Sequence, residues 1–357
     1  MEAERVEAEA PTSPVAASET PPVAPDPPVQ APQPAPALPA KLSLTADRTV
    51  TDAARETIAF GSAALERHRA AAAAGESEPI HQLRVTARRL RASLQLFESV
   101  THAAYTRMIE RDLAWMAQAA GGAREREINA EVFRVRASRL DPAFAQSIAL
   151  MESALTRERS ESLKALRKVV KSRRYRRLLQ RLENPRLRKV AADEPLGVRA
   201  ASMLRPIARA AARAGAELDE RSTPATIHRL RVRVKRLRYA IEMLSPMGGK
   251  RCRKLLARLE GLQELLGDLN DLSVATTWLI SFAKSDGTPA DAVMAAGAMA
   301  QSLRTRSSKL ARRSAKAWRK LDKDHAIADA ISEIRRNGKQ AQLKPVPTPE
   351  TTTVTAA

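Results

Sequence analysis

The chain has 357 residues, of which 61 are Lys or Arg and 40 are Asp or Glu, so its formal net charge is +21. A body this basic attracts polyanions, and the candidate partners are nucleic acid, an anionic membrane surface or an inorganic phosphate polymer. The single cysteine, Cys252, excludes an internal disulfide and a four-thiolate metal site. Because neither a secretory signal nor a membrane-spanning apolar run is evident, a soluble, cytoplasmic protein is expected.

Both ends of the chain are typical of disordered segments. Residues 1–40 contain eleven of the 22 prolines and carry mostly acidic charges, and the last residues read KPVPTPETTTVTAA. Segments without apolar periodicity cannot pack a core. We therefore predict disordered tails over residues 1–43 and 339–357, around a folded body at 44–338.

The body is rich in Ala, Leu, Arg, Glu and Lys, which is a helical composition, and it shows no alternation typical of strands. Proline and glycine positions divide it into helices. Two helix starts match each other, with hydroxyl residues ahead of Pro79 and of Pro224. Two glycine breaks also match, at Gly121–Gly122 and at Gly267. An all-α fold is predicted.

One segment of the sequence occurs twice. Residues 80–91 read IHQLRVTARRLR, and residues 227–238 read IHRLRVRVKRLR. Further matches after each copy predict a tandem of two helical halves, at about 46–184 and about 195–337.

Each copy separates into two rows when it is placed on a helix. One row is apolar and predicts a core face. In the first copy it holds Leu83, Ala87, Leu90, Leu94 and Phe97, and in the second copy it holds Leu230, Val234, Leu237, Ile241 and Leu244. The other row is basic, and in the two copies it consists of His81, Arg84, Arg88 and Arg91, and of His228, Arg231, Lys235 and Arg238. Arg89 and Arg236 lie on the opposite flank of their helices.

The basic rows have two interpretations. A charged row on an amphipathic helix is usually a solvated face, but such faces mix Glu with Lys at i,i+4 spacing. Residues 79–97 and 224–241 contain no acidic residue. Like charges at this spacing repel each other, and the repulsion occurs in both copies at matched positions. This favours an anion-binding site. Arginine suits phosphate because its planar guanidinium forms paired hydrogen bonds and stays charged.

The two histidines stand near the starts of their helices, where free backbone N–H groups favour an anion and disfavour imidazolium. We expect His81 and His228 to be neutral in the free protein and to become protonated beside phosphate. The alternative is a helix-start residue bonded to a neighbouring backbone group.

Other candidates are secondary. Arg124 and Glu125 follow the first glycine pair, and Asn270 and Asp271 follow the second glycine. The acids either orient arginines of the basic rows or cap the next helix. Arg174, in the charged run KSRRYRR (171–177), either extends the basic surface or belongs to a solvated face.

These motifs resemble the CHAD domain, the conserved-histidine α-helical domain, over about residues 44–338. The resemblance rests on the repeated pattern H-x-x-R-V-x-x-[RK]-R-x-R and on the later glycine element. It implies two four-helix bundles in tandem, a pseudo-two-fold axis and a central basic channel that binds inorganic polyphosphate. Its ligand-facing residues fall here on His81, Arg84, Arg88, Arg89, Arg91, His228, Arg231, Lys235, Arg236 and Arg238. Arg124–Glu125 and Asn270–Asp271 depart from the Arg-Asp pair common in the family, and no E-x-E-x-K motif of the triphosphate-tunnel enzymes is present.

Three function classes are weighed on these residues. A polyphosphate-binding protein, associated in some family members with polyphosphate granules, fits clustered arginines without aromatic platforms. A non-specific nucleic-acid-binding protein fits the net charge, but single-strand binders need stacking residues, and aromatic residues make up 3% of the chain. An enzyme would need a nucleophile with its base, or carboxylates for a metal, which the basic rows lack. We therefore expect no catalytic residue, no metal, no cofactor and weak nucleic-acid binding in low salt.

Overall fold

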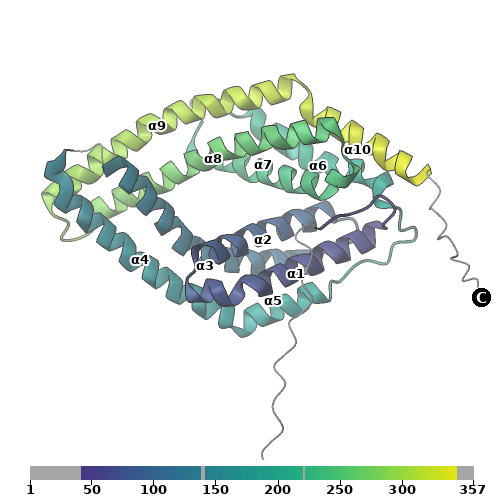
Figure 1. Ribbon diagram of the computed structural model, residues 1–357, viewed down its shortest axis with the longest axis horizontal. Coiled ribbons are helices and arrows are strands. Elements are labelled where there is room, and N and C mark those ends of the chain that lie inside the picture. The colour runs from purple at the N-terminus through teal and green to yellow at the C-terminus, as the bar shows by residue number, and fades with distance from the viewer. Residues whose placement is uncertain (1–41, 138–140, 220–221, 344–357) are drawn as a thin grey trace, which may run out of the picture. The chain divides into compact units, whose positions relative to one another are not determined.

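The computed structural model describes residues 42–137, 141–219 and 222–343, all in the compact unit Pro39–Ala357. The regular elements in these ranges are helices, accompanied by two isolated β-bridges (Figure 1). The prediction of an all-α fold is confirmed. Nearly all of the predicted tail at 1–43 lies outside the described residues, as does 344–357.

Ten α-helices follow one another in the described ranges. The first five are α1 (Val50–Ala74), α2 (Ser77–Leu96), α3 (Ala103–Ala137), α4 (Ala145–Lys171) and α5 (Arg173–Glu183). The next five are α6 (Leu196–Ala216), α7 (Pro224–Leu244), α8 (Lys250–Ala283), α9 (Ala290–Lys323) and α10 (Ala326–Leu343). Short 3₁₀ helices at Pro142–Phe144 and Ser245–Met247 precede α4 and α8. Helix α10 passes the predicted end of the folded body at residue 338.

Each set of five helices has one helix more than the predicted four, because two helix boundaries escaped the sequence patterns. Ser172 has an extended backbone and accepts the N–H of Tyr175 through its hydroxyl, so α4 ends and α5 begins there without a proline or glycine. His325 separates α9 from α10 with a φ of 49°, a left-handed conformation that residues other than glycine seldom adopt.

The predicted glycine breaks are wrong. Helix α3 continues through Gly121 and Gly122, and α8 continues through Gly267. A glycine inside a helix costs only about 1 kcal/mol relative to alanine, which the packing of a long helix readily outweighs.

The two predicted helix starts differ from each other. Thr223 caps α7 as expected, since its hydroxyl accepts the N–H of Thr226, and Pro224 follows in the first turn. The N-cap of α2 is Glu76, whose side chain forms no capping bond. Ser77 instead lies inside the helix, where its hydroxyl donates to the carboxylate of Glu127.

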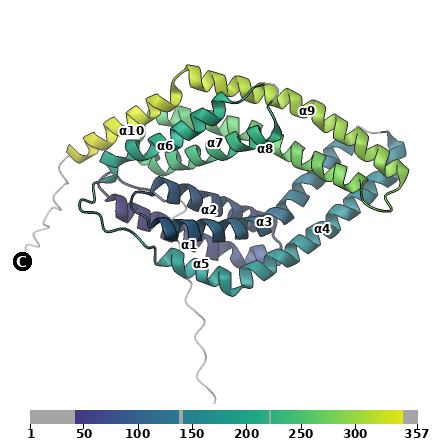
Figure 2. The same ribbon diagram turned by 180° about the vertical axis from the view of Figure 1, so that it is seen from behind.

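Packing brings corresponding helices of the two sets together. Helix α2 contacts α7, α3 contacts α8, and α4 contacts α9, while α1 to α5 and α6 to α10 lie on opposite sides in Figures 1 and 2. This is the pattern that a two-fold relation between repeated halves produces. The bundle arrangement itself remains a prediction. Among the described residues, no helix is long and apolar enough to cross a membrane.

The N-terminus of α8 is held by a buried carboxylate from α10. Glu333 accepts backbone N–H groups of Gly249 at 2.9 Å, Arg251 at 3.2 Å and Cys252 at 2.8 Å. Burial raises the pKa of Glu333, but the three N–H donors outweigh burial, so the pKa is lowered overall. The carboxylate thus satisfies the free donors that every helix start exposes.

We expect Glu333→Gln to lower the free energy of unfolding by about 2 kcal/mol, because an amide replaces a charged acceptor of three hydrogen bonds. Urea denaturation at neutral pH measures the change. Asp329→Asn on the same helix is the control: Asp329 forms an exposed, 3.9 Å ion pair with Arg251, so its loss should cost less than about 0.5 kcal/mol. Equal effects would contradict an anchoring role.

Candidate anion-binding site

Helices α2 and α7 place the two basic rows. Leu83, Leu90, Leu230 and Leu237 are buried, as are the other apolar-row residues Ala87, Leu94, Phe97, Val234, Ile241 and Leu244. The predicted core faces are therefore confirmed. The His, Arg and Lys residues predicted to face the ligand on α2 and α7 are half-buried, except Arg89 and His228, which are exposed.

The two rows act on each other electrostatically. The pKa of Arg84 is lowered first by burial and then by Arg88, with a further contribution from Arg231 on the other helix. The pKa of Arg231 is likewise lowered by burial, and Arg88 lowers it further. The pKa of Lys235 is lowered by burial and then by cations of both helices, Arg231 on α7 and Arg88 and Arg84 on α2. We call Arg84, Arg88, Arg231 and Lys235 the central cation cluster.

Several nitrogens of the rows are buried without a hydrogen-bond partner. Among the described residues, nothing accepts from Nη1 of Arg84, from Nε of Arg88 and Arg91, or from Nε of Arg231 and Arg238. A buried donor without an acceptor costs roughly 1–3 kcal/mol, more when it is charged. Five such donors on two facing helices make a site that an anion would complete.

Lys235 is the most strongly perturbed member of the cluster. Burial, followed by the charges of Arg231 and Arg88, lowers its pKa to about 7, and Asp271 opposes the shift. Its counterpart in the first repeat is Arg88.

Two carboxylates face the cluster. Asp271 has its pKa raised by burial, and the hydrogen bond from Asn270 and the charges of Arg231 and Lys235 oppose the shift. Glu125 acts on both Arg84 and Arg231. Both acids lie inside continuous helices, which excludes the helix-capping alternative. That they orient arginines of the basic rows stays a prediction.

Gly121 gives the guanidinium of Arg84 its space. A Cβ atom at this position would lie 3.1 Å from Nη1 of Arg84 and 3.6 Å from Oε1 of Glu125. In the second repeat, a Cβ atom on Gly267 would meet nothing within 4 Å. The glycine is thus explained by close approach in the first repeat alone.

The two histidines differ in their surroundings. The pKa of His81 is lowered mainly by burial; Glu78 opposes this, and Arg88, Arg124 and Arg84 reinforce it. This agrees with a neutral His81 in the free protein. His228 is exposed, and its Nδ1 lies 3.4 Å from Oδ1 of Asn270. Asn270 thereby connects His228 with Asp271.

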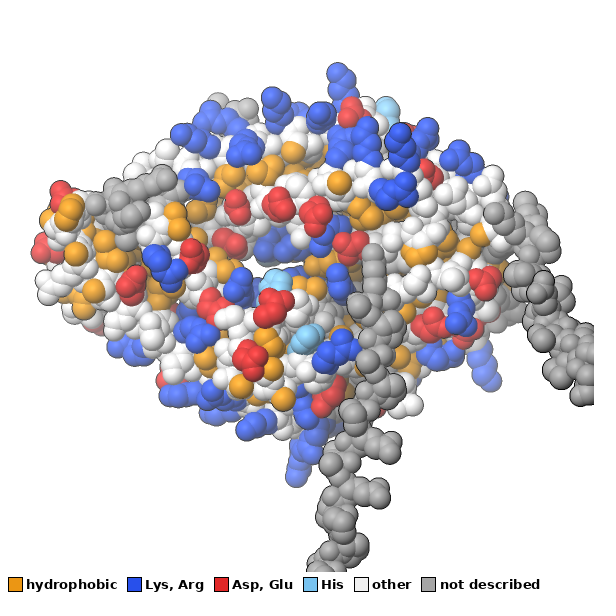
Figure 3. Space-filling model, viewed as in Figure 1, with side chains coloured by type: hydrophobic (Ala, Val, Ile, Leu, Met, Phe, Trp, Pro, Cys, Tyr) orange, Lys and Arg blue, Asp and Glu red, His pale blue; other side chains and the backbone are white. Residues whose placement is uncertain are grey.

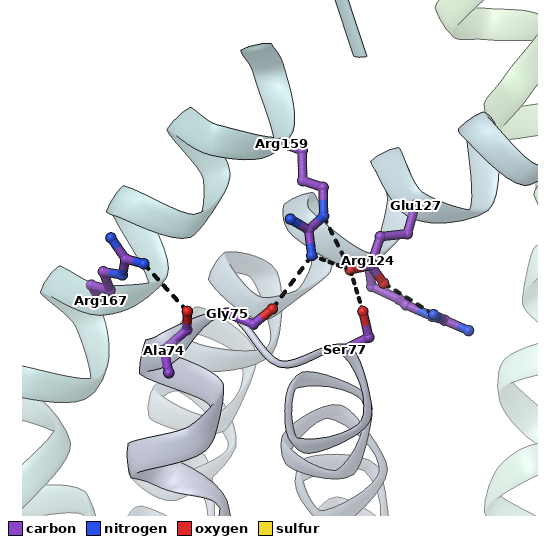
Figure 4. Close-up of polar contacts among 7 residues, drawn as sticks. All are labelled: Ala74, Gly75, Ser77, Arg124, Glu127, Arg159 and Arg167. Carbon is purple, nitrogen blue, oxygen red and sulfur yellow. Dashed lines mark hydrogen bonds and ion pairs between the residues drawn. The ribbon is translucent and has the colours of Figure 1, made fainter. Parts of the chain in front are cut away.

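A network around Glu127 fixes the start of α2, and the sequence patterns missed it. Glu127 accepts from Ser77 at 2.7 Å, from Arg124 at 3.0 Å and from Arg159 at 2.6 Å, and Arg159 also donates to the carbonyl of Gly75 (Figure 4). Helices α2, α3 and α4 are tied together in this way. Arg124 belongs to this network and also lowers the pKa of His81 after the effect of burial. Its role in anion binding stays a prediction.

The other secondary candidate, Arg174, lies on α5. It forms a 2.7 Å ion pair with the buried carboxylate of Asp112 and lies 4.3 Å from the ring centre of Trp115. These contacts tie α5 to α3. Its role in anion binding stays a prediction.

The face drawn in Figure 3 is hollowed between the two layers of helices, and basic and histidine side chains lie around the hollow together with several acidic ones. A cavity of about 640 Å³ on the molecule is lined by Arg124, Glu127, Asp268 and Asp271, among others. Among the described residues, no three His, Cys, Asp or Glu side chains are grouped to hold a metal ion.

Comparison with known proteins identifies the family. The CHAD domain family matches residues 57–280, and the chain therefore belongs to this family, which is associated with polyphosphate binding. The fold is similar to the crystal structure of the CHAD domain from the plant Ricinus communis, with a TM-score of 0.62 and 22% identity, covering 84% of this chain and 94% of that chain. It is also similar to PptA from Streptomyces chartreusis, with a TM-score of 0.64 and 19% identity, covering 76% and 100%. No curated protein matches the chain.

We expect Lys235→Met to stabilise the anion-free protein by at least about 1 kcal/mol at pH 6, the equivalent of less than one pKa unit. Below pH 7 the folded protein carries the unfavourable Lys235 charge. As the pH rises from about 7 towards the ordinary lysine value of 10.5, the folded state releases a proton that the unfolded chain keeps, so the penalty and the gain both shrink.

Thermal denaturation in a buffer without multivalent anions measures this difference. Lys254→Met, at an exposed position on α8, is the control and should change the free energy of unfolding by less than about 0.5 kcal/mol, at pH 6 and at higher pH alike. A destabilised Lys235→Met protein at pH 6 would contradict the assigned repulsion.

Proposed function

We propose that the protein binds inorganic polyphosphate between the basic rows of α2 and α7, in the channel that the family resemblance implies. The observation that carries the proposal is the set of buried, unpartnered guanidinium nitrogens on both facing helices. A linear polymer with one negative charge on nearly every unit supplies acceptors to several of them at once. Membership of the CHAD family supports the same ligand.

The protein is proposed to act as a binding protein, not as an enzyme, in the cytoplasm and in association with polyphosphate granules. The residues around the central cation cluster supply charge and hydrogen-bond donors. The two acids near it, Glu125 and Asp271, lie among arginines that repel a metal ion. Binding without turnover is the activity that such a site supports best.

Non-specific nucleic-acid binding is the alternative. It draws on the same net charge through phosphate contacts and counterion release. The rows offer few aromatic platforms, since Tyr239 is buried beneath Arg89 and Arg238. The central cluster is therefore suited to phosphate more than to bases.

Competition separates the two functions. Polyphosphate should displace bound DNA at a far lower concentration of charge than DNA needs to displace polyphosphate. Fluorescence anisotropy with labelled DNA and labelled polyphosphate measures both directions at fixed salt. Equal competition per charge would refute the polyphosphate proposal in favour of diffuse electrostatics.

We expect Arg88→Ala with Lys235→Ala to weaken polyphosphate binding by about 100-fold or more, because two charge-assisted contacts of roughly 1.5–3 kcal/mol each are lost. The control, Arg69→Ala with Arg335→Ala, removes the same charge outside the rows and should weaken binding only a fewfold. Isothermal titration calorimetry measures both. Equal losses would mean that no defined site exists.

Binding should also weaken as the pH rises above about 7, because phosphate binds the charged form of Lys235 and part of the free protein has lost that proton. The limit for uptake of one proton is about tenfold per pH unit. In Lys235→Arg the dependence between pH 7 and 9 should flatten, since arginine stays protonated. An unchanged pH profile in this variant would contradict the assignment.

A further inference from the structure

Two pairs of arginines flank the central cation cluster. Arg89 and Arg238 come from different helices and both lie against the ring of Tyr239, at 5.8 Å and 5.3 Å from its centre. The repeat equates Arg89 with Arg236, and Arg238 with Arg91. The corresponding second pair, Arg236 and Arg91, is also close. The pKa of Arg236 is lowered first by burial and then by the charges of Arg233 and Arg91.

The first flank is neutralised by carboxylates. Glu242 lies 3.2 Å from Arg238 and 3.8 Å from Arg89, and Glu260 of α8 lies 3.2 Å from Arg238. The side chain of Arg238 is only 15% exposed. We call Arg89, Arg238, Glu242 and Glu260 the acid-paired flank; it holds as many carboxylates as cations.

The second flank keeps its positive charge. The position of Glu242 is taken by Gln95 in the first repeat, and that of Glu260 by Ala114. Nε of Arg91 and Oε1 of Gln95 are buried without a partner among the described residues. We call Arg91, Arg233 and Arg236 the open flank; Glu110 is the acid that acts on Arg236 there.

A row of acids on α8 reinforces the difference. Glu260, Glu264 and Asp268 follow at four-residue spacing and are exposed, so they share one side of the helix that packs against α7. On α3, which packs against α2, the matching positions are Ala114, Gln118 and Gly122. Figure 3 shows acidic side chains in a row beside the hollow.

We infer that a bound phosphate chain continues from the central cation cluster over the open flank and not over the acid-paired flank. The inference rests on the proposed function and adds a direction to it. A polyanion on the acid-paired flank would approach the carboxylates of Glu242 and Glu260 or have to displace their ion pairs. On the open flank it meets Arg91, Arg233 and Arg236, which form no ion pair among the described residues, whereas Arg89 and Arg238 do. Arg233 replaces Thr86 of the first repeat.

Chain length tests this direction. Short chains span the central cluster alone, whereas long chains also reach the flanks. For Arg233→Ala with Arg236→Ala, the loss of affinity should be larger for long chains than for short chains, by about tenfold or more. For Arg89→Ala with Arg238→Ala, the loss should be the same for both lengths. Calorimetry with the full chain, and circular dichroism to confirm folding, gives both ratios.

A gain-of-function variant provides an independent test that does not remove any arginine. Glu242→Gln with Glu260→Gln should open the acid-paired flank and strengthen the binding of long chains severalfold, with a smaller effect on short chains. The control is Glu66→Gln with Glu161→Gln, which releases two carboxylates that are also ion-paired, with Arg69 and Lys164, elsewhere. It should affect both lengths equally.

Each outcome discriminates. The same length dependence in both arginine variants, or an equal gain in both glutamine variants, would overturn the direction but leave the polyphosphate site intact. Failure of the wild-type protein to bind chains of either length would overturn the proposed function itself.

Discussion

Repulsion between facing cations is the constraint on which the rest of the structure depends. Arg84, Arg88, Arg231 and Lys235 are half-buried and near one another, and the pKa of Lys235 records the cost. Apolar rows on the opposite sides of the same helices hold α2 and α7 in place against this repulsion, since each buried leucine contributes roughly 1.5–3 kcal/mol. The fold thus stabilises a charge distribution that would not assemble by itself.

Acidic side chains around the cluster offset part of this repulsion, for some cations more than for others. Glu125 and Asp271 face the central cations from α3 and α8, while Glu127 holds the first turn of α2 by contacts to Ser77 and Arg159. Glu125 and Asp271 act on the central cations through charge, whereas Glu127 anchors a helix start. The donors left over are what a bound anion would use.

Sequence periodicity was enough to separate the core face from the basic face of α2 and α7, because both rows repeat at helical spacing within one short segment. The all-α class followed from the composition of the body, and the family resemblance followed from this segment together with the later glycine element. Local signals failed where tertiary contacts decide. Gly121 predicts a break in isolation, but it lies within α3 and leaves room for Arg84. The contacts of Glu127 with Ser77 and Arg159, and the ion pair of Arg238 with Glu260, join different helices, so no spacing pattern along the chain reveals them.

The internal repeat has a consequence for how such a site can evolve. In a dimer of identical subunits, every substitution appears twice, so the two ends of a site on the symmetry axis must remain the same. Here both copies are encoded separately, and Glu242 can arise without changing Gln95. Fusion of the halves into one chain therefore permits a symmetric scaffold to carry an asymmetric surface. A polymer with two equivalent ends can then be held by a protein whose two ends are not equivalent.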